Sequence, residues 1–473
     1  MFNFNKNRRM RKLFLALTAG MLMLPAAAQN IDSVWIKKIS DEILLHGQAY
    51  ENLRHLTKQI GGRLAGSPGM VKAENWGLEV MKKSGADQAW LQECMVPHWV
   101  RGGADFAQAA YTVPASKTKN MIPQKKGLDV VALGNSMGSG PKGVTAPVLL
   151  VNSFDELEAK KDEVKGKIVF YNYKFNDTYV STFNAYRDAG QYRGAGPSRA
   201  AKYGAIGVIV RSMSHAVDNN PHTGATRYDS AYPKIPAVAI GLRDADWLSE
   251  QVQKTGVNVT LRTNGKFLPD TIGHNVIGEL KGSEFPDQII TVGGHLDSWD
   301  NCEGAHDDGA GCVQTIEILR ALKALGYTPK RTIRFVLFAN EENGLRGGTK
   351  YAEVAAAKGE KHILAIESDA GGFTPRALGF TGSDEQYAKF LSWKPLIAPY
   401  GCSELVKGGG GADIGPLNRT LKTPMASLNP DTQRYFDIHH ARSDVFEAVN
   451  KRELELGAVN MAALIYLVDK YGL

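Results

Sequence analysis

The sequence predicts an α/β fold in which a mostly parallel sheet is covered by helices on both faces. Two observations lead to this prediction. From residue 271 onward, unbroken apolar runs of strand length alternate with amphipathic helical segments, which is typical of such a sheet. Between about residues 121 and 270 the pattern changes to short, closely spaced strands, which indicates a smaller β-rich unit. We expect one α/β domain that this unit interrupts, because the helical segments before it need a sheet to pack on.

The chain begins with a predicted secretory leader. Its 473 residues are enough for two domains, and 43% hydrophobic residues allow a sizeable core. Residues 1–28 combine a basic start, an apolar run over Leu13–Leu24 and the small residues Ala26–Ala28, which predicts a signal peptide cleaved before Gln29. The apolar run is shorter than the ~20 residues of a membrane-spanning helix. We therefore expect export, to the periplasm or the extracellular medium.

The net charge and the cysteines indicate which partners and which cross-links to expect. Five basic residues lie in the leader, and subtracting them from the formal charge of +7 leaves +2. So small a charge gives no reason to expect binding to nucleic acid or to an anionic membrane. An exported chain permits disulfides, so the cysteines form one disulfide or remain buried thiols. The four cysteines are Cys94, Cys302, Cys312 and Cys402.

The first two parts of the chain contain these predicted elements. Apolar spacing predicts helices over 39–60 and 70–84, with a glycine-rich loop at Gly61–Gly69 between them. Residues 114–143 have the composition of a segment that connects one unit to another. In the β-rich unit we expect one helix near Ser198–Tyr203. The strands expected there are Ala146–Val151, Gly166–Tyr171, Ile206–Val210, Ala237–Ile240 and Val257–Arg262.

In the last part of the chain, strands and helices alternate. Three strands are predicted, at Gln288–Gly293, Thr332–Phe338 and His362–Glu367. The helices are predicted at about 309–325, 346–358, 384–396 and 451–470.

Acids and histidines follow the predicted strands or open the predicted helices. Ligands of such sheets bind beyond the carboxyl ends of the strands, so we expect these side chains to meet at one edge. Each motif alone is common, and the prediction depends on their order and placement. The residues are His295 and Asp297 after the first strand, Asp307 before a helix, Glu341 and Glu342 after the second strand, Asp369 after the third, and His439 and His440 near the C-terminus.

The chemistry of this set indicates zinc. Without cations the acids would repel one another, and zinc accepts imidazole and carboxylate ligands together. The set is large enough for two ions that share a carboxylate. Asp307, which lies before Asp308 and Gly309 at a tight turn, suits the shared position.

The motifs resemble those of a known family. The runs Gly294–Asp300, Gly304–Gly309, Glu341-Glu342, Glu367–Gly371 and His439-His440 are similar in order and spacing to the two-zinc exopeptidase family of secreted aminopeptidases, and within it to the carboxypeptidase Q branch. The resemblance implies the zinc exopeptidase fold.

The β-rich unit resembles a protease-associated domain. The similar segments are Gly166–Phe170, Ala200–Gly207 and Ile235–Val238, and the loop Gly61–Gly69 matches the family pattern Arg-x-x-Gly-Ser-Pro. The implied organisation is a signal peptide at 1–28, the first part of the peptidase domain at 29–120, the insert at 121–270 and the catalytic part at 271–473.

The resemblance also implies metal ligands. The first zinc would be held by His295, Asp307 and Asp369. The second zinc would be held by Asp307, Glu342 and His440, with Asp307 bridging the two ions.

Three more residues receive roles by the resemblance. Asp297 would accept the second ring N–H of His295 and so fix its tautomer. Glu341 would be the general base. His439 stands where secreted aminopeptidases have a tyrosine that is assigned to the oxyanion, and a shift of the last ligand from His440 to His439 stays open.

The implied activity is hydrolysis of terminal peptide bonds in dipeptides or short peptides. The residues leave open whether the amino or the carboxyl end is preferred, whether the chain forms a homodimer, and whether cobalt or manganese replaces zinc. Asp413 either faces a substrate amino group or is a solvated acid in a glycine turn. Two other functions stay open: a non-catalytic, receptor-like binding protein of this fold, and a single-zinc glutaminyl cyclase.

Overall fold

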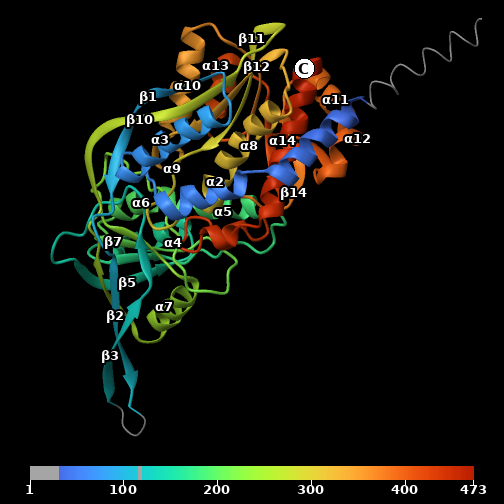
Figure 1. The fold of residues 1–473 in the computed structure, drawn as a ribbon. Coiled ribbons are helices and arrows are strands. Elements are labelled where there is room, and N and C mark those ends of the chain that lie inside the picture. The colour runs from blue at the N-terminus through green and yellow to red at the C-terminus, as the bar shows by residue number, and fades with distance from the viewer. Residues whose placement is uncertain (1–30, 116–119) are drawn as a thin grey trace, which may run out of the picture.

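The computed structural model describes residues 31–115 and 120–473, so the predicted signal peptide lies outside the described residues. Two eight-stranded sheets organise this part of the chain. The helix-rich part around the first sheet and the part around the second sheet lie one against the other (Figure 1).

The first sheet has the strand order β1-β10-β12-β11-β13-β16-β14-β15. Its central strands run parallel: β12 (Arg331–Phe338), β11 (Phe285–His295), β13 (Lys361–Glu367) and β16 (Met425–Pro430). Antiparallel pairs occur towards the edges, in β1 (Gln88–Val100), β10 (Lys266–Leu280) and β14 (Pro375–Thr381), and β15 (Glu404–Lys407) pairs parallel to β14. The predicted α/β class is therefore confirmed, with the parallel strands in the middle of a mixed sheet.

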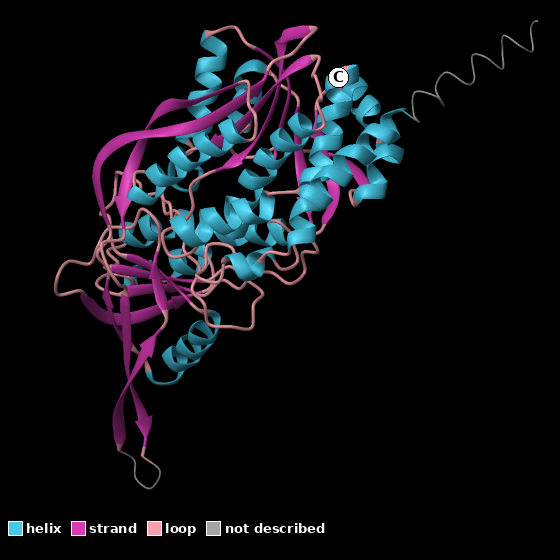
Figure 2. Cartoon of the chain, viewed as in Figure 1, coloured by secondary structure: helices cyan, strands magenta, loops and turns pink. Residues whose placement is uncertain are grey.

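Helices cover both faces of the first sheet (Figure 2). Along β12, Ile333 and Phe335 pack into one core, and the alternating Val336 and Phe338 pack into the other. This alternation follows from the two-residue period of a strand. One face packs on α2 (Ala49–His55), α3 (Pro68–Lys83), α8 (Ala310–Ala324) and α14 (Lys451–Tyr471), and the other on α10 (Arg346–Ala357) and α13 (Gly415–Leu421).

The helices differ from prediction in small ways. The predicted helix at 39–60 is divided, because residues 31–46 form one helix and α2 begins after Gly47. The predicted helix at 384–396 is also divided, into α11 (Asp384–Ser392) and α12 (Lys394–Ile397). The strands β1, β10, β14, β15 and β16 and the helix α13 were not predicted, because none of them contains a long apolar run.

The second sheet has the strand order β3-β2-β9-β5-β6-β7-β8-β4. All five strands predicted in this region are present: β5 (Val144–Val151), β6 (Ile168–Tyr171), β7 (Gly207–Arg211), β8 (Ala237–Ile240) and β9 (Asn258–Arg262). The predicted helix is α6 (Gly196–Lys202). Three further helices make the unit more helical than expected: α4 (Phe154–Ala159), α5 (Thr182–Gly194) and α7 (Leu242–Thr255).

The second sheet begins earlier in the chain than residue 121. The strands β2 (Phe106–Pro114) and β3 (Met121–Leu128) form an antiparallel hairpin that pairs with β9, and this hairpin projects from the rest of the chain (Figure 1). Its polar, lysine-containing second strand is largely exposed. A strand that buries few side chains has no apolar alternation. The composition of this segment therefore indicated a connection between two units and not a strand.

Two long strands join the two sheets. The chain leaves the first sheet after β1 and returns through β10, and these strands pair from Gln88 with Glu279 to Val100 with Lys266. The second-sheet unit is thus inserted between two neighbouring strands of the first sheet. No helix within residues 31–115 and 120–473 has the length and apolar character needed to cross a bilayer. All four cysteines lie in this part of the chain and are free thiols.

Candidate metal centre

The predicted site residues lie at the carboxyl ends of the central parallel strands. His295 is the last residue of β11, the short helix α9 (Glu341–Gly344) follows β12, and Asp369 follows β13. Asp307 lies in the turn before α8, where a cis peptide bond joins it to Asp308. The adjacent His439 and His440 come from the loop between β16 and α14. Residues far apart in the sequence are therefore brought together.

Asp307 lies between two sets of side chains. Its Oδ1 is 3.2 Å from Nε2 of His295, which is also 3.5 Å from Oδ1 of Asp369. Its Oδ2 is 3.2 Å from Nε2 of His440, which is also 3.1 Å from Oε2 of Glu342. The two carboxylate oxygens thus face two different histidine–carboxylate pairs.

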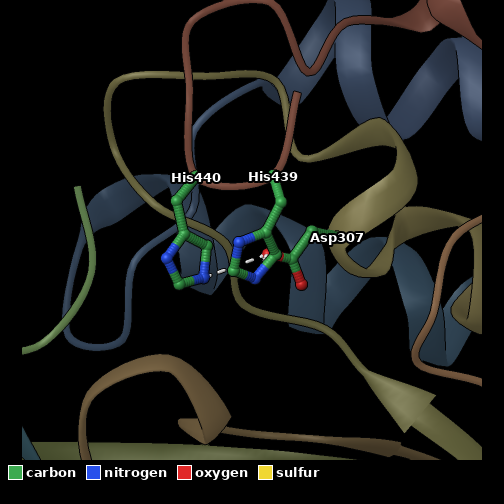
Figure 3. A group of neighbouring side chains, drawn as sticks. All are labelled: Asp307, His439 and His440. Carbon is green, nitrogen blue, oxygen red and sulfur yellow. Dashed lines mark ion pairs between the residues drawn. The ribbon is translucent and has the colours of Figure 1, made fainter. Parts of the chain in front are cut away.

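Both adjacent histidines face Asp307. Figure 3 shows the two rings side by side next to the Asp307 carboxylate, and their centroids are 3.6 Å apart. Nε2 of His439 is 3.4 Å from Oδ2 of Asp307. Among the described residues, an ion-pair contact with Glu342 is made by His440 and not by His439. His440 therefore contacts both Asp307 and Glu342, whereas His439 contacts Asp307, and both histidines have ring nitrogens placed to share a metal ion with Asp307.

Asp308 is a second acid close to the first set. His295, Asp308 and Asp369 have potential ligand atoms within 4.8 Å of one another. The carboxylate of Asp308 already accepts the backbone N–H groups of His295 at 3.0 Å and of Gly311 at 2.8 Å. Asp307 is the better candidate ligand, because its Oδ2 has no hydrogen-bond partner in the described chain.

The unpaired atoms of this cluster fit a cation. Within the described residues, Nε2 of His295, Oδ2 of Asp307 and Oε1 of Glu342 are buried and have no hydrogen-bond partner. Buried polar atoms are nearly always paired, and neutral imidazole nitrogens and carboxylate oxygens are metal ligands. Burial and the neighbouring Asp307 carboxylate raise the pKa of Glu342 to about 7. A cation would reverse this effect and satisfy the unpaired atoms.

Asp297 acts through two different groups. Nδ1 of His295 is 2.9 Å from the backbone oxygen of Asp297, whereas the Asp297 carboxylate is farther away, at 3.7 Å. The carboxylate instead accepts the backbone N–H groups of Glu341 at 2.9 Å and of Glu342 at 3.2 Å. The expectation that this carboxylate accepts the His295 ring N–H is corrected: the backbone carbonyl does so, and the side chain positions the start of α9.

A cavity of about 490 Å³ opens over the cluster. This volume lies within the roughly 300–1,000 Å³ typical of small-molecule sites. Residues of both sheet units line it: Asn135, Phe183, Tyr186, Arg193, Ala225, Arg227, Asp307, Glu341, Glu342, Asn343, Gly344, Leu345, Asp369, Tyr435, His439 and His440. The contributions of the second-sheet unit were not predicted.

Asp413 is fully buried and does not line the cavity. It is therefore neither a solvated acid nor a residue that faces a substrate amino group in this cavity.

The second-sheet unit holds the histidine loop. The backbone N–H of Thr223 donates to the carbonyl of His440 at 3.0 Å, and Nδ1 of His440 lies 3.3 Å from the carbonyl of Thr223. When Nδ1 donates to that carbonyl, Nε2 is left with its lone pair directed at Asp307 and Glu342. Nδ1 of His222 lies 2.7 Å from the carbonyl of His439. The loop at 220–226 therefore orients a candidate ligand.

Arg63, from the loop Gly61–Gly69, positions the backbone next to two of the candidate ligands. Its side chain is fully buried and donates to the backbone carbonyls of Leu296, Glu303 (2.7 Å) and Gly304 (2.9 Å). Leu296 follows His295, and Gly304 opens the turn that contains Asp307. The Arg-x-x-Gly-Ser-Pro pattern of this loop thus has a structural role that the sequence did not suggest.

The fold and the donor cluster together define a metal-dependent hydrolase. Residues 275–465 match the model of Peptidase family M28. Carboxypeptidase Q of Bos taurus is 34% identical over 424 residues, which cover 89% of this chain and 85% of that protein. The crystal structure of a Peptidase M28 precursor from Shewanella amazonensis is 30% identical, with a TM-score of 0.86 over 93% of this chain and 97% of that one. The chain belongs to peptidase family M28 and is a metallo-exopeptidase, which confirms the resemblance.

A more distant structure has the same fold. A zinc aminopeptidase from Bacillus subtilis superposes with a TM-score of 0.61 at 22% identity, over 89% of this chain and 94% of that one. Enzyme relatives and a complete set of candidate ligands leave the receptor-like alternative without support.

Proposed function

We propose that this metallo-exopeptidase holds two zinc ions and hydrolyses terminal peptide bonds of dipeptides or short peptides. His295, Asp307 and Asp369 would hold one ion, and Asp307, Glu342 and His440 the other. The observation that carries the proposal is the position of Asp307, whose two oxygens face two separate histidine–carboxylate pairs at 3.2 Å. The name of the Bacillus subtilis relative supports zinc.

The reaction needs a proton acceptor beside the ions. When bound, zinc polarises a scissile carbonyl and lowers the pKa of water. Glu341 lines the cavity next to the proposed ligand Glu342, and we assign it the role of general base. Its carboxylate takes a proton from the attacking water and passes it to the leaving amine.

Two other residues complete the proposed machinery. The Asp297 carboxylate positions Glu341 by accepting its backbone N–H at 2.9 Å. His439 lies against Asp307 and lines the cavity, so an N–H of its ring is suited to stabilise the developing oxyanion.

The remaining proposals concern processing and organisation. We assign the inserted unit to the protease-associated class, and we propose export with cleavage before Gln29. N-terminal sequencing of the exported protein tests the second point.

A panel of dipeptides tests the proposed function. The purified enzyme is assayed on one dipeptide with free ends, with a blocked amino end and with a blocked carboxyl end, each with and without a chelator. We expect cleavage of the free dipeptide, loss of activity with the chelator, and recovery on adding zinc. Metal analysis should give two zinc ions per chain.

Two outcomes would contradict the proposal. Chelator-insensitive cleavage would exclude metal-dependent catalysis by this centre. One zinc per chain, together with cyclisation of a peptide with an amino-terminal glutamine and no hydrolysis, would favour the glutaminyl cyclase alternative.

A further inference from the structure

Two arginines of the second-sheet unit line the cavity without an acidic partner. They are Arg193 in α5 and Arg227 in the loop that follows Thr226. Within residues 31–115 and 120–473, neither guanidinium forms an ion pair with Asp or Glu. Partly buried arginines elsewhere, such as Arg320 and Arg334, are paired with carboxylates. The two cavity arginines are therefore free to pair with an anion that enters the cavity.

The backbone that carries Arg227 is fixed, although its side chain is exposed. The N–H of Arg227 donates to the carbonyl of Gly194 at 2.9 Å, and the N–H of Thr226 donates to the carbonyl of Gly134 at 2.8 Å. Within the described chain, the guanidinium of Arg227 makes no hydrogen bond. The fixed backbone places this charge at the cavity wall, and the exposed side chain keeps the freedom to turn towards a ligand.

Arg193 lies beside Arg227, because the carbonyl that accepts the Arg227 N–H belongs to Gly194, the next residue after Arg193. The side chain of Arg193 is held more firmly than that of Arg227. Nη2 of Arg193 donates to the Tyr186 hydroxyl at 2.6 Å, and the guanidinium lies 5.2 Å from the centroid of the Tyr186 ring. Its buried Nε has no hydrogen-bond partner among the described residues. Arg193 thus adds positive charge to the same wall, and the contacts of its guanidinium with Tyr186, Thr223 and His440 hold it in place.

We infer that Arg227, with Arg193 beside it, binds the free α-carboxylate of the peptide substrate. This inference rests on the proposed function. When a short peptide is cut at its terminal bond, its own α-carboxylate also lies in the cavity. The planar guanidinium matches a carboxylate with two parallel hydrogen bonds. The candidate ligands and the base lie on the first-sheet side of the cavity and the arginines on the inserted side. The enzyme therefore prefers dipeptides with a free carboxyl end, since longer chains carry the carboxylate away from this wall.

The test compares a dipeptide with its amide. Alanyl-alanine and alanyl-alaninamide have the same scissile bond and differ in the terminal charge. For the zinc-loaded wild type we expect kcat/KM to favour the free acid by about tenfold or more, because a charge-assisted hydrogen bond is lost in the amide. In Arg227→Gln this ratio should fall towards one, mainly through a higher KM for the free acid. Arg227→Lys should restore part of it, since lysine keeps the charge without the fork.

A matched control is available on the same unit. Arg187 also lies in α5, but it is exposed and does not line the cavity. Arg187→Gln should keep the wild-type ratio, and zinc content and melting temperature of all variants should match the wild type.

The outcomes separate the two proposals. If the wild type cleaves both substrates equally well, or if Arg227→Gln keeps the wild-type ratio, the carboxylate subsite is wrong and the exopeptidase function stands. If Arg227→Gln slows both substrates by the same factor, Arg227 has a structural role instead. If the wild type with zinc cleaves neither substrate nor any other free dipeptide, the proposed function itself fails, and this inference fails with it.

Discussion

Glu341 and Glu342 are adjacent, yet their side chains have different surroundings. Glu342 is buried and its Oε2 is 3.1 Å from Nε2 of His440. Glu341 is partly exposed and faces the cavity. Burial raises the pKa of Glu341 well above its usual range, and the carboxylates of Asp369 and Glu342 add to this effect. Bound zinc ions would offset the part of this effect that comes from the carboxylates, so the assignment as general base rests on the position of Glu341 at the cavity beside Glu342.

The first prediction concerns this base. Glu341→Gln should keep the fold and both zinc ions, and kcat should fall by about 10²–10⁴-fold or more, because the amide cannot accept a proton. Steady-state kinetics with zinc analysis measures this. Glu353→Gln, at an exposed acid of α10, is the control and should retain wild-type turnover. A Glu341 variant with near-normal turnover would refute the assignment.

A second prediction concerns Arg63. Its guanidinium donates to three backbone carbonyls, and no carboxylate of the described residues lies within ion-pair distance of it. Lysine cannot reproduce these three bonds with the same geometry, because it lacks the planar, forked set of N–H donors of a guanidinium. Arg63→Lys should lower zinc affinity by about 10–100-fold, as for other residues that position metal ligands. Competition with a zinc chelator measures the affinity. The exposed Arg54, which bonds Glu51, serves as the control as Arg54→Lys, and equal affinities in the two variants would exclude the positioning role.

At the scale of elements, the inserted unit takes part in the centre. The loop at 220–226 contacts the loop with His439 and His440 through backbone and ring hydrogen bonds. Gly224 lies in this contact with φ of +126°, and a Cβ added there would be 2.4 Å from Nη1 of Arg193 and 2.7 Å from Nδ1 of His440. The close packing requires glycine at this position.

The third prediction follows from that contact. Gly224→Ala should displace the His440 ring or Arg193, and should therefore lower zinc occupancy and kcat/KM together. Gly256→Ala is the matched control, because Gly256 also has a positive φ, of +73°, but no heavy atom lies within 4 Å of the added Cβ. Both variants are strained in the backbone, so a defect confined to Gly224→Ala isolates the contact with the histidine loop. Equal zinc content in the two variants would argue against this interpretation.

At the scale of the whole molecule, the proposed ions would connect separate parts of the chain. The candidate ligands come from the ends of three strands and from two loops, between residues 295 and 440. Their buried carboxylates repel one another without a cation. The centre should therefore stabilise the fold as well as catalyse the reaction.

The fourth prediction concerns removal of the metal. A chelator should lower the melting temperature by several degrees, because a ligand at 1,000 times its Kd stabilises the folded state by ~4 kcal/mol. Added zinc should restore it. His295→Ala loses a ligand, so the chelator should shift its melting temperature much less. A wild-type melting temperature that does not respond to the chelator would contradict a structural contribution of the ions.

Several features were predictable because they are local. The apolar run of β11 and the helical spacing of α8 record burial within a short stretch of chain. The meeting of His295, Asp307 and Glu342 followed from a general rule, since parallel strands end at the same edge of a sheet. The hairpin β2–β3 was missed for the opposite reason, because an exposed strand carries no apolar pattern.

The sequence alone determined the fold class, the order of the strands' motifs and the residues of the candidate centre, because these depend on local periodicity and chain order. Tertiary structure decided which group of Asp297 contacts His295 and which histidine also reaches Glu342. It also decided that Arg193 and Arg227 line the cavity and that Thr223 contacts His440. Those features depend on side-chain orientation and on the docking of segments about 200 residues apart, and such contacts leave no local trace in the sequence.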